Sequence, residues 1–159
     1  MSRGFVYIMT NPSMATVVKI GKTTRTPEQR RDELWQTGVP TPFEVFASVF
    51  SPDCHQLERD IHVALRGARV SQSREFFYLP ASEALEELNH LHRLQVDSLI
   101  AEFLPHHCAV HESIAVNEEE LVKLGNDLGI SPAQIISAVP SLDAESLNAA
   151  IRYSEGYER

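Results

Sequence analysis

Charged side chains that can bind or transform a phosphate group gather in two parts of the sequence. The first part is a basic segment that contains Lys19, Lys22, Arg25, Arg30 and Arg31. In the second part, Glu58 and His62 are four residues apart, which places them one turn apart on the same side of a helix. A carboxylate and an imidazole so placed can act with a metal ion or exchange protons, but an ordinary pair on a helix surface has the same spacing.

The distribution of charge divides the chain into two halves. The formal net charge is −8, which by itself argues against a nucleic-acid partner, because phosphate contacts usually come from a basic surface. However, residues 1–80 hold 10 Lys/Arg and 8 Asp/Glu, whereas residues 81–159 hold 4 and 14. We therefore expect the two halves to have different roles.

Length and cysteine content limit the class of protein. A chain of 159 residues forms about one domain with at most a small appendage. Cys54 and Cys108 are too few for a disulfide framework or a four-cysteine zinc site, so we expect free thiols in a reducing cytoplasm. No apolar run reaches the roughly 18 residues of a membrane span, and the N-terminal residues lack a cleavage signal. These features predict a soluble cytoplasmic protein without a membrane partner.

The first residues predict a β-hairpin followed by a helix. Residues 4–9 and 16–20 are rich in β-branched and aromatic residues, and a turn-forming cluster separates them. Thr26 is the expected N-cap of the helix, with a proline after it and Gln29 completing a capping box. This helix should end near Gln36.

A second strand–helix–strand pattern follows. Residues 42–50 alternate apolar with smaller or polar residues, as a half-buried strand does, and residues 75–79 form a further strand. A helix is expected between these two strands, with Ser51 and Pro52 as its cap. Its apolar stripe consists of Leu57, Ile61 and Leu65. Residues 1–80 are therefore predicted to form an α+β domain, with a mostly antiparallel sheet flanked by helices.

The second half, residues 81–159, is predicted to be an acidic helical region. Leucines at spacings of three indicate a long amphipathic helix over residues 82–104, then a linker at 105–116 and two or three short helices. Four neighbouring residues have zinc-ligand side chains, but their spacing favours a polar hinge: His106, His107, Cys108 and His111. A helix-turn-helix outline near Gly129 lacks basic residues in its second helix, which favours a homodimer or protein contact over DNA reading.

Several short motifs occur in an order that resembles the GIY-YIG nuclease superfamily. These are Gly4-Phe5-Val6-Tyr7, Lys19-Ile20-Gly21, an arginine in the next helix, a glutamate within "LERDIH", and "REFF". The phage and bacterial subgroup whose second motif reads KIG is the most similar. The resemblance covers residues 4–79.

The resemblance implies a metal-dependent endonuclease that hydrolyses phosphodiester bonds, most often of DNA. Carried over to this sequence, Tyr7 helps activate the water, Arg30 contacts the scissile phosphate, and Glu58 holds Mg²⁺ or Mn²⁺ beside the leaving oxygen. Arg31 is the neighbouring alternative to Arg30. Glu75 stands near the position where the family commonly has an asparagine, and is either a second metal contact or a water-positioning group.

The predicted site also includes Lys19, His62 and four residues that should contact the nucleic acid. Most family members have a tyrosine where this sequence has Lys19. Desolvation and nearby positive charge would favour the neutral form of this lysine, which could then accept a proton from Tyr7 or water. His62 is a candidate general base, phosphate donor or outer partner of the metal. Residues expected to approach the nucleic acid are Gly21, Lys22, Arg25 and Arg31.

Two other functions remain open at this point. The same fold could have lost its chemistry and become a nucleic-acid-binding or protein-interaction module, for which Lys19 and the missing asparagine are the support. Alternatively, the acidic residues 81–159 could regulate a protein partner, for example as a decoy that resembles DNA.

Overall fold

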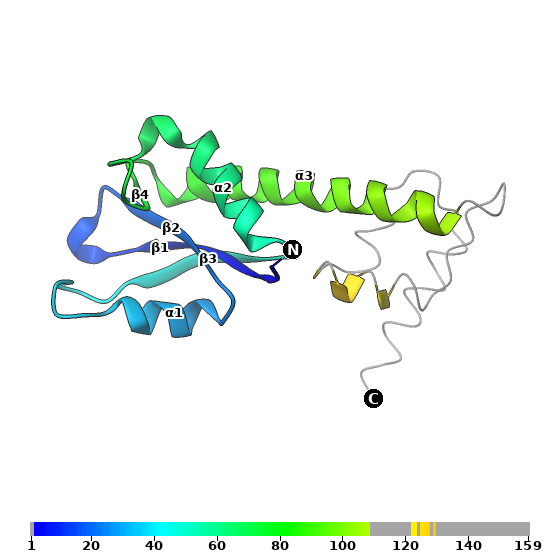
Figure 1. Cartoon of the computed structure of the whole chain (residues 1–159). Coiled ribbons are helices and arrows are strands. Elements are labelled where there is room, and N and C mark those ends of the chain that lie inside the picture. The colour runs from blue at the N-terminus through cyan, green and yellow to red at the C-terminus, as the bar shows by residue number, and fades with distance from the viewer. Residues whose placement is uncertain (1, 109–121, 124, 128, 130–159) are drawn as a thin grey trace. The chain divides into compact units, whose positions relative to one another are not determined.

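The computed structural model describes residues 2–108, 122–123, 125–127 and 129. Its sheet has the strand order β3-β1-β2-β4, and every pairing is antiparallel. Helix α1 lies on one side of this sheet, and α2 lies on the other (Figure 1). The prediction of an α+β unit with an antiparallel sheet flanked by helices is confirmed.

The hairpin of β1 (Gly4–Thr10) and β2 (Val18–Thr23) is the centre of the sheet. The turn between them contains the short 3₁₀ helix η1 (Pro12–Met14). Successive side chains of a strand point to opposite faces, so Val6 and Ile8 pack on the α2 side, whereas Tyr7 and Met9 pack on the α1 side. β2 starts later than expected and continues through Thr23, because its pairing with β1 extends as far as Phe5.

Helix α1 (Pro27–Leu34) begins as its sequence predicts. Thr26 is the N-cap, and its side chain and that of Gln29 form the expected reciprocal capping box. The helix ends at Leu34, slightly earlier than expected, and the backbone of Trp35 is already extended.

Strand β3 (Glu44–Ser51) leads into α2 (Cys54–Ala64). The N-cap of α2 is Asp53, whose side chain accepts a hydrogen bond from the backbone of Gln56, so the predicted cap at Ser51 and Pro52 is wrong by one to two residues. Ser51 instead accepts a hydrogen bond from the backbone N–H of Asp53. Leu57 and Ile61 are fully buried against β1 and β2.

The last elements are η2 (Arg66–Ala68), β4 (Phe76–Phe77) and the long helix α3 (Ala81–Cys108). β4 is much shorter than the strand predicted at 75–79, since it pairs only with Val18 and Lys19. Ala84 and Leu88 of α3 belong to the core on the α2 side, and the compact N-terminal unit extends to Arg93, beyond the boundary expected near Pro80.

The long helix predicted over residues 82–104 is confirmed, but the linker expected from Pro105 is wrong at its start. The helix continues through Pro105 to Cys108, although a proline inside a helix removes one backbone hydrogen bond. The hinge at His111, the helix-turn-helix outline and most of the acidic helical region lie outside the described residues. In the described part of the chain, no helix combines the length and apolar character needed to span a bilayer.

Candidate active site

The hydroxyl group of Tyr7 is at the centre of the candidate site. Tyr7 lies opposite Gly21 in the hairpin register and is only 1% exposed. A Cβ atom at position 21 would lie 2.6 Å from the Tyr7 hydroxyl oxygen, so the side chain depends on glycine there. Arg30 of α1 donates a hydrogen bond to Tyr7. Desolvation nevertheless raises the pKa of Tyr7, so the phenol keeps its proton near neutral pH.

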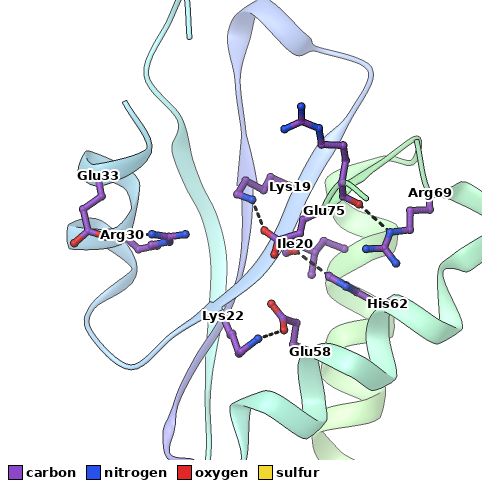
Figure 2. Close-up of polar contacts among 10 residues, drawn as sticks. Lys19, Ile20, Lys22, Arg30, Glu33, Glu58, His62, Arg69 and Glu75 are labelled. Atoms are coloured by element: carbon purple, nitrogen blue, oxygen red, sulfur yellow. Dashed lines mark hydrogen bonds and ion pairs between the residues drawn. The ribbon is translucent and has the colours of Figure 1, made fainter. Parts of the chain in front are cut away.

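Glu75, immediately before β4, lies beside this pair. A Cβ atom at position 21 would be 3.3 Å from its Oε2 atom, and Lys19 donates a hydrogen bond of 2.5 Å to that same oxygen (Figure 2). Burial acts to raise the pKa of Glu75, but the hydrogen bond and charge of Lys19, with the charges of His62 and Lys22, lower it on balance. The Glu75 carboxylate is therefore ionised at neutral pH.

Lys19 is buried, with 7% of its surface exposed, as the sequence analysis expected. Its ammonium group lies 5.4 Å from the centre of the Phe76 ring, and its ion-pair partner is Glu75. The neighbour of Lys19 is therefore a carboxylate, whereas nearby positive charge was expected from the sequence.

Glu58 reaches the site from α2, on the other face of the sheet. It is 8% exposed, and its Oε2 atom accepts a hydrogen bond from Lys22 (Figure 2). Lys22 is the residue after Gly21, so its side chain points to the α2 side of β2. Desolvation by burial is the main cause of the raised pKa of Tyr7, and the charges of Glu75 and Glu58 add to it as smaller causes.

His62 lies one turn after Glu58, as its spacing predicts. Its Nε2 atom is 3.0 Å from the carbonyl oxygen of Ile20 (Figure 2). A carbonyl oxygen only accepts, so Nε2 carries the proton, and Nδ1 is the other nitrogen available to a ligand. The imidazole ring also packs against Phe77, with 5.1 Å between ring centres.

These side chains meet at one edge of the sheet. β4 pairs only with Val18 and Lys19, and among the described residues no strand pairs with the outer edge of Gly21–Thr23. The side chains of Glu58, Lys22 and His62 come from the α2 side of this edge, and those of Tyr7, Arg30 and Lys19 from the α1 side. The open edge of β2 therefore gives access to groups from both faces.

The two other predicted arginines are directed elsewhere. Arg31 forms an ion pair with Asp32, and Arg25 forms one with Glu33. Glu33 also forms an ion pair with Arg30 at 3.2 Å and so helps to hold its side chain in place (Figure 2). Of the two candidates in α1, the structure brings Arg30 to the site.

Three arginines near the site were not singled out from the sequence: Arg66, Arg69 and Arg74. Arg66 and Arg69 follow α2 in a segment that no motif marks, whereas Arg74 is the first residue of the REFF motif. The fold brings Arg69 beside His62, because both side chains pack on Phe77 (Figure 2).

The side chains of the candidate site fit a magnesium ion that takes most of its ligands from water and phosphate. Among the described residues, no group of three or more His, Cys, Asp or Glu side chains is arranged as a metal cage. Mg²⁺ in phosphoryl-transfer sites typically uses one or two carboxylates and takes its other ligands from water and phosphate. Glu58, buried and close to Tyr7, can supply such a carboxylate.

Comparison with known proteins gives one match. A family model, the T5orf172 domain, matches residues 4–92, which contain every side chain of the candidate site. No curated protein and no solved structure matches the chain.

Proposed function

Because the chain belongs to the T5orf172 domain family, which is tied to GIY-YIG-like nuclease proteins, we propose that it is a metal-dependent endonuclease. Its substrate is a nucleic acid, DNA in the first instance, and it hydrolyses a phosphodiester bond. The single observation that supports this most strongly is the Tyr7 hydroxyl group, which lies over Gly21, binds Arg30, and is close enough to Glu58 and Glu75 to be affected by both charges.

In the proposed reaction, Tyr7 acts on the attacking water and Arg30 acts on the phosphate group. Tyr7 is protonated near neutral pH, so it orients the attacking water through its hydroxyl group and is not a preformed base. Arg30 is positioned by Glu33 and Tyr7, and its guanidinium group neutralises charge that develops on the phosphate.

Glu58 would hold the divalent ion, Mg²⁺ or Mn²⁺. When bound, the ion supplies positive charge beside the leaving oxygen. Lys22 donates to one oxygen of Glu58 in this structure, and beside a bound ion its ammonium group would be free to turn to a phosphate oxygen.

Glu75, Lys19 and His62 complete the proposed site. The ionised Glu75 can accept a hydrogen bond from the attacking water, and Lys19 holds the Glu75 side chain in place through its ammonium group. His62 is fixed by the Ile20 carbonyl oxygen, so its Nδ1 atom is the one that could take part in proton transfer or bind phosphate.

The test is cleavage of labelled single-stranded, duplex and branched DNA in Mg²⁺, in Mn²⁺ and in EDTA. We expect product only with metal, and a loss of at least about a hundredfold in Glu58→Gln. Asp60→Asn on the same helix is the matched control, because Asp60 faces Gln56 and not the site. Wild-type activity in Glu58→Gln would contradict the assignment of Glu58.

A second candidate function is a binding module that has kept the fold without the chemistry. The observation that favours it is that the side chains of Glu58 and Glu75 are each paired with a lysine of the same chain. In that case DNA binds with a steep salt dependence, and no substrate is cut with either metal.

A further inference from the structure

Most cations of the N-terminal unit that were expected to contact nucleic acid already have a carboxylate partner. Lys19 faces Glu75, Lys22 faces Glu58, Arg25 and Arg30 face Glu33, and Arg31 faces Asp32. An internal ion pair leaves little net charge for an approaching polyanion. These residues alone therefore do not form a strongly positive surface.

The three arginines that follow α2 are different. Arg66 and Arg74 are exposed and Arg69 is half-buried, and none of the three has a carboxylate partner in the described part of the chain. We refer to Arg66, Arg69 and Arg74 as the arginine segment. Its positive charge is not neutralised locally, in a chain whose net charge is −8.

The arginine segment is held in a defined conformation. The backbone N–H of Val70 donates to Phe76 at 2.8 Å, and that of Tyr78 donates to Ala68 at 2.7 Å. In addition, the Arg69 Nε atom donates to the carbonyl oxygen of Arg74 at 2.8 Å (Figure 2). A fixed backbone lowers the entropy that binding must overcome, so exposed arginines on it are suited to contact a ligand.

The arginine segment adjoins the candidate site. The Arg69 guanidinium group lies over the Phe77 ring, 5.8 Å from its centre, and His62 packs against the same ring. Arg74 directly precedes Glu75, the partner of Lys19. Arg69 thus shares a packing partner with His62 and holds the backbone of Arg74, so we infer that a strand bound at Tyr7 and Glu58 runs past this segment.

We propose that Arg66, Arg69 and Arg74 bind the phosphates next to the scissile one, and so supply the main electrostatic attraction for the nucleic acid. The proposal rests on the nuclease function proposed above, and it names the surface that holds the substrate. Guanidinium groups recognise phosphate through paired hydrogen bonds and carry no sequence information in that role. Binding through this surface is therefore independent of base sequence.

The test measures binding in EDTA, so that cleavage does not interfere. Fluorescence anisotropy of labelled single-stranded and duplex DNA of random sequence is recorded at several salt concentrations. For Arg66→Gln/Arg74→Gln we expect affinity to fall by more than about tenfold at 0.1 M salt. The slope of log affinity against log salt should decrease by about 0.7 to 0.9 for each arginine replaced.

Three controls separate the effect of charge from the effect of structure. Arg66 and Arg74 are exposed and form no ion pair within the described residues, so their replacement should leave thermal unfolding unchanged. Arg69→Lys keeps the charge and should bind better than Arg69→Gln, although both lose the geometry over Phe77. Arg93→Gln on α3, an exposed cation on a helix that contributes no site residue, should bind as the wild type does.

The possible outcomes distinguish this proposal from the nuclease function. If Arg66→Gln/Arg74→Gln binds DNA with wild-type affinity and salt slope while the wild type still cuts, the arginine segment is not the binding surface and the nuclease function stands. If binding falls as expected but no protein cuts any substrate, the surface is right and the nuclease function is wrong.

Discussion

Lys22 donates a hydrogen bond to the buried carboxylate of Glu58, across from β2 to α2. The side chain of Glu58 is 10% exposed and that of Lys22 is 28% exposed, so the pair is partly removed from water. Lys22 thus neutralises, in this structure, the same carboxylate that would hold a metal ion. Metal and ammonium compete for one acceptor.

Replacement of Lys22 by Gln should therefore have two opposite effects. Without metal, the free energy of unfolding should fall by about 1–3 kcal/mol, because a buried carboxylate loses its partner. With metal, affinity should rise several-fold, since the ion no longer displaces an ammonium group. Thermal unfolding in EDTA and titration calorimetry with Mn²⁺ measure the two effects.

The double variant Lys22→Gln/Glu58→Gln is the control for that experiment. It removes both charges, so it should regain stability relative to Lys22→Gln and lose its response to Mn²⁺. Equal Mn²⁺ affinity in the wild type and Lys22→Gln would show that Lys22 and the ion do not compete for Glu58, and unchanged Mn²⁺ binding in the double variant would show that Glu58 does not bind the ion.

Substitution of Gly21 by Ala should disrupt the position of Tyr7. The added Cβ atom would be 2.6 Å from the Tyr7 hydroxyl oxygen and 2.9 Å from the ring carbon that carries it. Because Tyr7 is packed in the core on the α1 side, the ring has little room to move, and we expect a loss of about 1–3 kcal/mol in unfolding free energy. DNA cleavage should fall with it.

Gly67→Ala provides the comparison, because a Cβ atom there would meet nothing within 4 Å. Its activity should remain at the wild-type level. If Gly21→Ala retained both stability and activity, Tyr7 would have to act from a different position.

Tyr7→Phe keeps the buried ring and removes the hydroxyl group. We expect the cleavage rate to fall by about 10²- to 10⁴-fold, whereas the unfolding free energy should change by only about 1 kcal/mol through the lost hydrogen bond to Arg30. Rates from single-turnover cleavage and melting curves should be recorded on the same samples.

The arginines of α1 give a matched pair for the phosphate contact. Arg30→Lys should reduce cleavage strongly, because lysine cannot reproduce the planar guanidinium geometry. Arg31→Lys should have little effect, since Arg31 forms an ion pair with Asp32 and does not reach Tyr7. The opposite order of effects would assign the phosphate contact to Arg31.

Stability should depend on the ionisation of Glu75 at acid pH. Its pKa in the folded protein is below the ordinary value of 4.5, mainly because of Lys19. A depressed carboxyl pKa adds stability above pH 4.5, and this stability is lost as pH falls from 4.5 through the folded-state pKa. The contribution is about 1 kcal/mol or less, because Glu75 is 42% exposed.

Melting curves of the wild type and Glu75→Gln between pH 7 and pH 3 measure this contribution. The wild type should be the more stable of the two at pH 7, and the difference should shrink below pH 4.5. A difference that stayed constant across this range would mean that the Lys19 pair does not contribute.

The strands and helices of the first half could be predicted well because each has a local signal. The capping box of Thr26 and Gln29 and the stripe of Leu57 and Ile61 are set by residues close in sequence. The length of β4 could not be predicted, since a strand ends where its partner ends, and only the folded hairpin shows that Val18 and Lys19 are the paired residues. Likewise, nothing local places Leu88 of α3 in the core of the same unit.

In the candidate site, too, some features could be predicted from the sequence and others could not. The order of motifs identifies Tyr7, Arg30 and Glu58, and the structure brings them near one another. The partners of the lysines were not foreseen, because Lys22 and Glu58 are 36 residues apart, and Lys19 and Glu75 are 56 apart. Which cation is neutralised and which is free depends on such long-range contacts, and the sequence offers no period or spacing that reports them.

The pairing of Tyr7 with Gly21 has a consequence for how this protein can change during evolution. The register that sets Tyr7 opposite Gly21 also sets Ile8 opposite Ile20, and both of those isoleucines are completely buried. A slip of one residue would move the side chains of the strand to the opposite faces, so that Tyr7 would enter the core on the α2 side and Ile8 the core on the α1 side. Selection for a stable hairpin therefore preserves the geometry of the site even when activity is no longer needed, and relatives that lose catalysis should do so by exchanging individual side chains on an unchanged backbone.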